Sequence, residues 1–255
     1  MTAAVAPPIV GLDGLLLSMA DDEFVIGFSD SEWTGIAPLL EEDVAMSSLS
    51  QDELGHAAAL YGLLAEITDK DADAIAYDRK PAEYCHARLL DHGRGDWAMT
   101  IARRYLYETS DAVRLEALVG GAWPPLAELV GKLKREERYH AMHIGAWFER
   151  LAGARGEPRD RLLEALATLG PDAGTVFTLL PDEPALIESG VLARPTEDLE
   201  RDWRARTAAA FAALDLPVLP STVRPERGRA DHGADFDWLY GEFTNVRRSD
   251  ADATW

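Results

Sequence analysis

The sequence predicts an all-α protein in which a four-helix bundle is followed by additional C-terminal helices. Four long segments carry apolar residues at alternating steps of three and four, which is the periodicity of a helix with one face in a core. Ionisable residues interrupt each apolar stripe near its middle, and the four segments form two similar pairs. These observations together predict a bundle whose core contains a polar site.

The first pair of helices is predicted over residues 12–30 and 39–68. A short turn through Trp33, Gly35 and Pro38 joins them. Such a short turn places the two helices side by side in opposite directions, as in an up-down bundle.

A longer connection follows over residues 68–95, and it is expected to carry short helices while crossing to the second pair. The third helix is predicted to begin after Asp96, a favourable N-cap, and to end at the glycine pair 120–121. Pro124 opens the fourth helix at a position where proline is tolerated, and this helix continues to about Leu151.

The rest of the chain differs in character. Residues 157–169 and 195–214 are amphipathic, and residues 230–246 are predicted to form a last helix. We therefore expect residues 1–155 to form the bundle and residues 156–255 to form a helical extension packed on it.

The polar residues within the stripes repeat with one spacing. Two Glu-x-x-His pairs each follow another glutamate, by 30 residues in the first half and 29 in the second (53 − 23 = 30, 137 − 108 = 29). The six residues are Glu23, Glu53, His56, Glu108, Glu137 and His140. One carboxylate helix and one Glu-x-x-His helix per half is the ligand set of ferritin-like di-iron and di-manganese proteins. The sequence therefore predicts a ferritin-like bundle in which these six residues bind two iron ions, with manganese as the alternative metal.

The place of these residues in the core strengthens the metal hypothesis. Glu53 and His56, for example, continue an apolar stripe between Leu49 and Leu60. Burying a carboxylate without a partner costs several kcal/mol or keeps it protonated. Two divalent cations would balance four carboxylates and leave the imidazoles neutral. The alternative, buried salt bridges, is disfavoured because no matching set of core-facing Arg or Lys is apparent at the same level of the stripes.

Residues next to the motifs have predicted roles as well. Each Glu-x-x-His is preceded by another acid, Asp52 or Glu136. A ligating histidine usually donates its other N–H to a carboxylate or carbonyl, so these acids are expected to orient the histidines across the bundle; alternatively, one or both face solvent. On the first helix the stripe and the spacing favour Glu23 over Asp22 as the ligand.

Other residues near the motifs are not expected to bind metal. The histidines in this group are His86, His92, His143 and His232. The tyrosines close to the ligands in sequence could store a radical, but tyrosines in a bundle more often serve in packing. They are Tyr105, Tyr107 and Tyr139.

Composition excludes several classes of function. The chain has 255 residues, a formal net charge of −20 and a single cysteine, Cys85. This charge argues against nucleic-acid binding, and one cysteine cannot hold a four-thiolate iron–sulfur cluster. No apolar run is long enough to span a membrane, and the start MTAAVAPPIVG lacks the basic segment of a signal peptide. We therefore expect a cytoplasmic protein without a membrane partner.

Several motifs resemble one family of oxygenase subunits. The segments are DEFVIGFSDSEW (22–33), SQDELGH (50–56), TIARRYLYE (100–108), KREERYHAMHIGAWFERL (134–151) and the ending over residues 231–255. They resemble the phenylacetyl-CoA epoxygenase A and C subunits of aerobic phenylacetate breakdown. The first two segments are similar to the catalytic A subunit, and the others are closer to the C subunit, which in the family has generally lost its metal ligands. This chain combines the length and ending of a C subunit with the complete ligand set of an A subunit.

The resemblance implies a di-iron monooxygenase component that activates O₂ to epoxidise or hydroxylate an aromatic acyl-CoA similar to phenylacetyl-CoA, with the six residues as the catalytic set. An external reductase would supply electrons, because the chain has neither an iron–sulfur relay nor a nicotinamide-binding motif. The chain would form a homodimer or a heteromer with a related subunit. One alternative is a metal-binding but non-catalytic structural subunit of such a complex, and a second is a ferritin-like oxidase.

A basic cluster flanks the second Glu-x-x-His motif. It consists of Lys132, Lys134, Arg135 and Arg138. These side chains could meet the phosphates of coenzyme A or an acidic partner, or they could be the solvated face of a helix.

Overall fold

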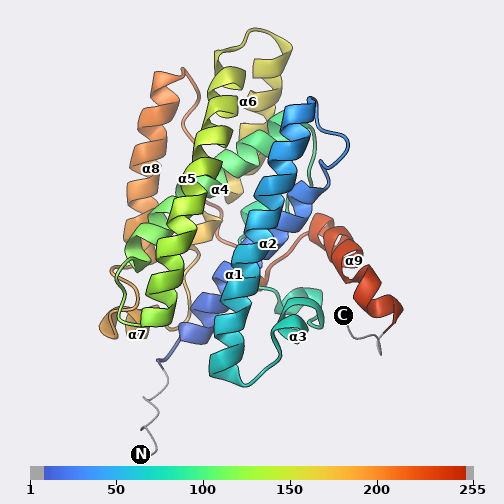
Figure 1. The fold of residues 1–255 in the computed structure, drawn as a ribbon. Coiled ribbons are helices and arrows are strands. Elements are labelled where there is room, and N and C mark those ends of the chain that lie inside the picture. The colour runs from blue at the N-terminus through green and yellow to red at the C-terminus, as the bar shows by residue number, and fades with distance from the viewer. Residues whose placement is uncertain (1–8, 251–255) are drawn as a thin grey trace, which may run out of the picture.

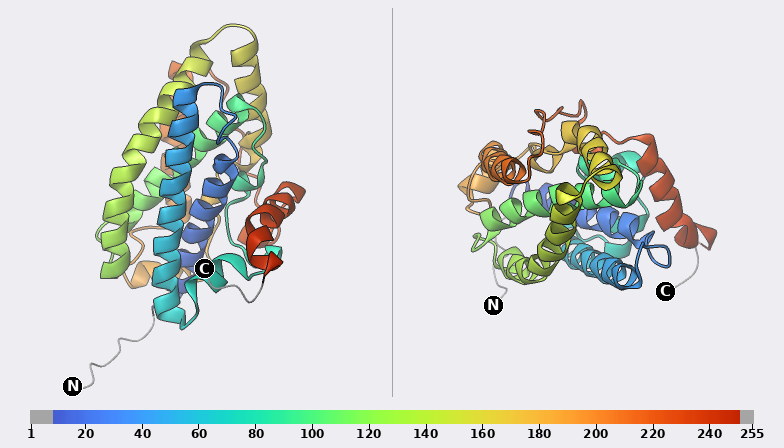
Figure 2. Two further views of the ribbon diagram at one scale, coloured as in Figure 1. Left: turned by 45° about the vertical axis from the view of Figure 1, so that its right-hand side comes forward. Right: turned by 90° about the horizontal axis from the view of Figure 1, so that it is seen from above.

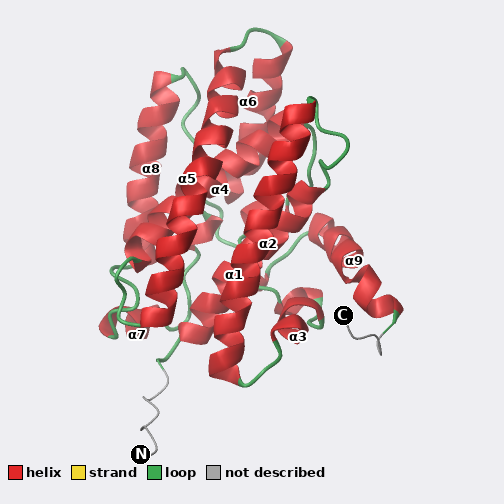
Figure 3. Cartoon of the chain, viewed as in Figure 1, coloured by secondary structure: helices red, strands yellow, loops and turns green. Residues whose placement is uncertain are grey.

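The computed structural model describes residues 9–250, and every regular element in that range is a helix (Figure 3). The all-α prediction is confirmed. Within the same range no helix is both long and apolar enough to cross a membrane. Residues 1–8, on which the signal-peptide expectation rests, and Trp255 lie outside the described residues.

Four long helices form the bundle (Figure 1). They are α1 (Leu12–Ser31), α2 (Leu40–Thr68), α4 (Trp97–Leu118) and α5 (Pro124–Gly153). Helix α1 packs mainly on α2, and α4 packs mainly on α5, so the chain forms two helical hairpins. The predicted positions of all four helices are confirmed.

Local chemistry explains where these helices begin and how closely they pack. The Asp96 carboxylate accepts a hydrogen bond of 2.9 Å from the backbone N–H of Met99 and thereby caps α4. Gly27 lies on α1 where α2 passes closest: a Cβ atom there would lie 3.0 Å from Leu54 Cγ and 3.1 Å from Glu53 Cβ. The missing side chain therefore lets α1 approach α2 at the level of the first Glu-x-x-His motif.

The helices differ in how much of their circumference is covered. Helices α2 and α5 lie side by side along one outer face of the bundle, with α1 and α4 behind them (Figures 1 and 2). The buried residues of α5 follow one seam: Leu126, Val130, Leu133, Glu137, His140, Ile144, Phe148, Leu151 and Ala152. By contrast, α1 and α4 are buried on nearly every face.

Short helices occupy the crossover between the two hairpins, as expected from the sequence. They are α3 (Ala72–Tyr77) and the 3₁₀ helices η1 (Pro81–Glu83) and η2 (Arg88–Asp91). The Asp71 side chain caps α3 by accepting a hydrogen bond of 2.9 Å from the N–H of Ala74.

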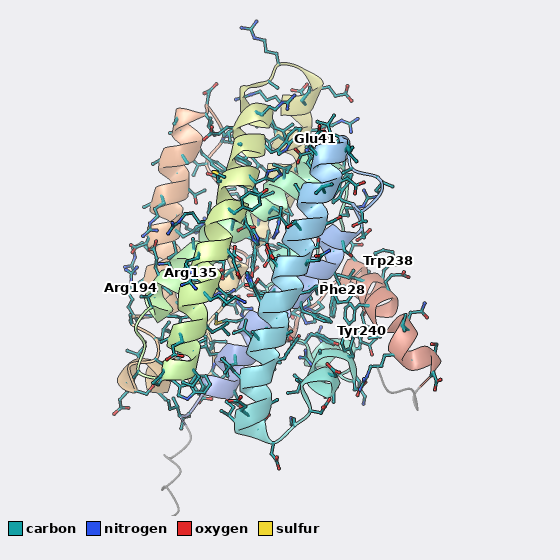
Figure 4. The ribbon with its side chains drawn as sticks, viewed as in Figure 1. Phe28, Glu41, Arg135, Arg194, Trp238 and Tyr240 are labelled. Carbon is teal, nitrogen blue, oxygen red and sulfur yellow. The ribbon has the colours of Figure 1, made fainter. Side chains whose placement is uncertain are left out.

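The C-terminal helices cover the inner hairpin helices. They are α6 (Glu157–Leu169), α7 (Glu183–Glu188), α8 (Thr196–Ala213) and α9 (Ala234–Ser249), with short 3₁₀ turns between them. Helices α6 and α8 pack on α4, whereas α9 packs on α1 and α3. On the α9 side, the ring of Phe243 lies 5.0 Å from Phe24 and 5.4 Å from Phe28 between centroids. Figure 4 shows Phe28 facing the side of the bundle on which α9 carries Tyr240.

Candidate metal centre

The structure brings all six predicted residues together in the middle of the bundle. Helix α1 supplies Glu23 and α4 supplies Glu108, while α2 and α5 each supply one Glu-x-x-His pair. All six side chains are buried, and the most exposed residue among them, Glu137, is only 8 % exposed. The helical periodicity therefore predicted the location of these residues correctly.

Within the described residues, the donor atoms form two overlapping groups. One contains Glu23, Glu53, His56 and Glu137, and the other contains Glu53, Glu108, Glu137 and His140. Within each group one donor atom per residue lies within 4.8 Å of the others. Glu53 and Glu137 belong to both groups. Two adjacent cation positions that share two carboxylates are the arrangement expected of a di-metal carboxylate centre.

Each histidine is oriented by an acid from the opposite helix. His56 on α2 lies 2.9 Å through Nε2 from Glu136 Oε2 on α5, and His140 on α5 lies 3.3 Å through Nε2 from Asp52 Oδ2 on α2. This places both Nδ1 atoms inward, 3.2 Å from Glu137 Oε1 and 3.3 Å from Glu53 Oε1 respectively. The hydrogen bonds across the bundle that the sequence analysis expected are therefore present.

Each of the six residues has one buried donor atom that finds no hydrogen-bond partner among residues 9–250. The atoms are Glu23 Oε2, Glu53 Oε2, His56 Nδ1, Glu108 Oε1, Glu137 Oε1 and His140 Nδ1. Buried polar atoms are nearly always paired, so a set of six around one point requires an explanation. Carboxylate oxygens with two imidazole nitrogens suit iron or manganese, and the six residues therefore fit a pair of such ions.

The pKa values of the cluster follow from its burial and its excess of acids. Burial and the neighbouring Glu53 carboxylate raise the pKa of Glu23 well above its ordinary value. Burial and Glu137 do the same to the pKa of Glu108. Burial alone would lower the pKa of His140, but the carboxylates of Glu137 and Glu53, 3.4 and 3.3 Å from Nδ1, outweigh it and raise the pKa to about 11. Without a metal, the cluster therefore holds protons at neutral pH.

One cationic side chain reaches the centre, contrary to the sequence-based expectation. Arg104 is fully buried, and its Nη1 donates to Glu53 Oε1 and lies 3.1 Å from Glu108 Oε1, outside hydrogen-bond geometry. Its Nε lies 3.0 Å from Asp30 Oδ2. The sequence analysis expected no matching set of core-facing Arg or Lys at this level, and Arg104 is one such residue that it missed. The signal was present, because Arg104 lies four residues before Glu108 and therefore on the same face of α4.

Asp22 does not reach the centre, which makes Glu23 the α1 residue of the site. The Asp22 carboxylate is hydrogen-bonded to Arg114 and Arg229 instead. Tyr107, expected to be a packing residue, donates a hydrogen bond of 2.9 Å to Glu23 Oε1. It therefore supports the site directly, which the sequence did not reveal.

The remaining histidines and tyrosines lie elsewhere. His143 pairs with Glu42 at 2.9 Å, and His92 pairs with Asp172 at 2.9 Å. The rings of His86 and His232 stack with centroids 4.1 Å apart and share the carboxylate of Asp91. Tyr105 stacks on Phe148 at 3.8 Å, and Tyr139 is 48 % exposed.

A cavity of about 400 Å³ lies at the end of the bundle where α1 begins and α2 ends. Its apolar lining includes Leu17, Leu64, Ala74 and Ile75. None of the six residues of the centre lines this cavity, so it does not give access to the metal positions.

The fold and the cluster define a ferritin-like helical bundle with a candidate di-metal centre. A family model described as phenylacetic acid catabolic protein matches residues 11–255, and the chain belongs to this family. The chain is 28 % identical over 209 residues to the C subunit of 1,2-phenylacetyl-CoA epoxidase from Escherichia coli (strain K12). That match covers 81 % of this chain and 84 % of the relative. The family resemblance seen in the sequence is confirmed.

Proposed function

We propose that the centre binds two iron ions and that the protein is the oxygen-activating component of a phenylacetyl-CoA epoxidase-type monooxygenase. The observation that carries the proposal is the set of six inward-facing buried donor atoms, one from each residue, with two carboxylates common to both positions. Membership of the phenylacetic acid catabolic family and similarity to an epoxidase subunit support an aromatic acyl-CoA as the substrate.

The six residues are distributed over the two proposed metal positions. Glu53 and Glu137 would contact both metals, while Glu23 with His56 and Glu108 with His140 would each complete one position. Glu136 and Asp52 accept the Nε2–H of the two histidines and so keep the Nδ1 lone pairs directed inward. Tyr107 holds the outer oxygen of Glu23 and leaves its other oxygen free for a cation.

Bound reduced iron would supply the capacity to activate dioxygen, and the protein residues would supply position and charge. One oxygen atom would enter the substrate and the other would leave as water, which consumes two electrons and two protons. The chain has one cysteine and so cannot hold a four-thiolate iron–sulfur relay. We therefore propose that an external reductase supplies the electrons. We also propose that the chain forms a homodimer or a heteromer with a related subunit, and that it is located in the cytoplasm.

Metal analysis tests the proposal first. Protein from iron-supplemented cells should contain about two iron or manganese ions per chain, and the double variant Glu137→Ala, His140→Ala should contain almost none. Oxygen uptake with phenylacetyl-CoA and a reductase should then depend on the bound iron. A metal-free parent protein with intact helical structure would contradict the proposal.

A second candidate function is a metal-binding structural subunit, and two observations favour it. The relative is a C subunit, and Arg104 already balances part of the buried charge with a side chain of the protein itself. This candidate predicts tight association with a related catalytic subunit and no substrate-dependent oxygen uptake by this chain. Full turnover with reductase and without a second subunit would rule it out.

A further inference from the structure

The two proposed metal positions differ in how closely a cationic side chain of the protein approaches them. Around His140, the Arg104 guanidinium touches Glu53 and lies 3.1 Å from Glu108. Around His56, Glu53 presents its other oxygen, Oε2, 3.6 Å from His56 Nδ1. The guanidinium beside Glu23 is that of Arg114, 3.9 Å from Oε1, the oxygen that already accepts the Tyr107 hydroxyl. The inward oxygen of Glu23 has no hydrogen-bond partner within residues 9–250. Arg104 therefore contacts the Glu53 oxygen and the Glu108 carboxylate that face His140, and the negative charge of the His140 position is compensated more closely than that of the His56 position.

The Arg104 side chain does not reach solvent, but a second carboxylate, that of Asp30, lies beside it. The side chain is fully buried, and its Nε and Nη2 have no hydrogen-bond partner among residues 9–250. Asp30 lies beside it: Oδ1 accepts from Arg103 at 2.8 Å, whereas Oδ2 has no hydrogen-bond partner in the same range and lies 3.0 Å from Arg104 Nε. A small rotation toward Asp30 would pair both groups and withdraw the guanidinium from Glu53.

We propose that Arg104 is an internal counter-ion that sets the order of metal binding, an inference that rests on the proposed di-metal centre. A guanidinium stays protonated at any physiological pH, so it competes with a divalent ion for Glu53 and Glu108. The first metal binds at the His56 position. The second binds at the His140 position only as Arg104 turns to Asp30 and its charge-assisted contact with Glu53 breaks. Such contacts are worth roughly one to two powers of ten in an equilibrium constant, so the second metal should bind about 10- to 100-fold more weakly.

Titration of the metal-free full chain with Mn²⁺ alone tests this order. Calorimetry should resolve two dissociation constants with that ratio, and the paramagnetic resonance spectrum should change from an isolated ion to a coupled pair only after the first equivalent. His56→Ala should remove the tight step, and His140→Ala the weak one. Two equal sites in the parent would overturn the inference and leave the proposed centre intact, whereas no bound Mn²⁺ would overturn both.

Variants of the arginine and its second partner provide the decisive comparison. Arg104→Met should tighten the second step at least tenfold, and Asp30→Asn should weaken it because the alternative partner is lost. Arg104→Lys retains the positive charge and should preserve the order, which keeps the test valid if Arg104→Met fails to fold. Arg135→Met, a matched charge change on the exposed face of α5 (Figure 4), should leave both steps unchanged. An unchanged ratio in a folded Arg104→Met protein would overturn the inference.

Discussion

Three consecutive acids on α1 enter two different buried clusters. Asp21, Asp22 and Glu23 are all fully buried. Asp21 and Asp22 belong to what we call the arginine cluster, which consists of Asp21, Asp22, Asp111, Arg79, Arg114 and Arg229. Glu23 belongs to the candidate metal centre. Burial is the same for the three residues, so it does not distinguish the two clusters.

Charge balance does distinguish them. The arginine cluster pairs three carboxylates with three guanidinium groups, and its acids also accept backbone N–H groups: Cys85 N donates to Asp21 and Ala87 N donates to Asp22, each at 2.6 Å. The metal centre places four glutamates around one arginine, which Asp30 also contacts. The arginine cluster has equal numbers of acids and guanidinium groups, and it ties the crossover and the C-terminal segment to α1. The candidate metal centre has more acids than cationic side chains, which makes it the functional candidate.

The largest predicted loss of stability follows from a substitution that breaks the arginine cluster. Asp22→Asn keeps the shape but leaves Arg229 without its charged partner and Arg114 with Asp111 alone, which should cost about 3–5 kcal/mol in the free energy of unfolding. Urea unfolding measures this loss. The exposed Glu41→Gln at the start of α2 (Figure 4) is the control and should change stability by less than about 0.5 kcal/mol. A similarly small effect for Asp22→Asn would contradict the structural role of the cluster.

A second effect, on metal affinity, should be confined to the centre. Glu136→Ala and Asp52→Ala each remove the acid that orients one histidine, and each should weaken Mn²⁺ binding about 10- to 100-fold. The exposed Glu66→Ala on α2 should bind Mn²⁺ like the parent. If all three variants bind equally well, the orienting role assigned to these acids is wrong.

Asp22 in the arginine cluster and the acids of the metal-free centre should respond to pH in opposite directions. Burial alone would raise the pKa of Asp22, but Arg229 and Arg114 outweigh it and lower the pKa, so its contribution to stability is lost as the pH falls below about 4. In the metal-free centre, the raised pKa values of Glu23, Glu108 and His140 mean that the folded state binds more protons than the unfolded state. That contribution is lost as the pH rises, first above about 4.3 for the glutamates and then above about 6.5 for the histidine.

Urea midpoints measured in the presence of a chelator at pH 4, 6 and 8.5 test both slopes. The metal-free protein should be less stable at pH 8.5 than at pH 6, and saturating Mn²⁺ should remove most of this loss because metal replaces the bound protons. Higher metal-free stability at pH 8.5 than at pH 6 would contradict the pKa directions in the centre.

The smallest predicted change in the free energy of unfolding best distinguishes the candidate metal centre from the arginine cluster. Glu23→Gln replaces a buried carboxyl whose pKa is raised well above its ordinary value, and its amide oxygen can still accept the Tyr107 hydroxyl. In the metal-free protein it should therefore change the free energy of unfolding by less than about 1 kcal/mol. Its neighbour Asp22→Asn should cost several times more. Equal losses at both positions would show that Glu23 is a structural acid as well.

Sequence periodicity was most informative for the outer helices. On α5, the buried residues follow the apolar stripe of the sequence, except for one of its residues: Trp147 is only half-buried, while its neighbour Phe148 is buried. The stripe consists of Leu126, Val130, Leu133, Glu137, His140, Ile144, Trp147 and Leu151. One face of α5 is open to solvent, so its core-facing residues stand out against polar ones. On α4, the C-terminal helices α6 and α8 cover the opposite side, and buried polar residues such as Arg103 and Arg104 obscure the stripe. The arginine in the centre was missed for this reason.

The sequence by itself determined the four bundle helices, the short helices of the crossover and the residues that face one another in the core. Helix formation, capping and the direction of side chains depend on residues three or four apart, so these features can be read locally. Only the tertiary structure decided which buried acid receives an arginine and which does not. Asp22 and Arg229 are separated by 207 residues, and no local pattern encodes such a pairing. Those distant contacts therefore decide that the candidate metal centre, and not the arginine cluster, is the buried site with fewer cationic side chains than acids.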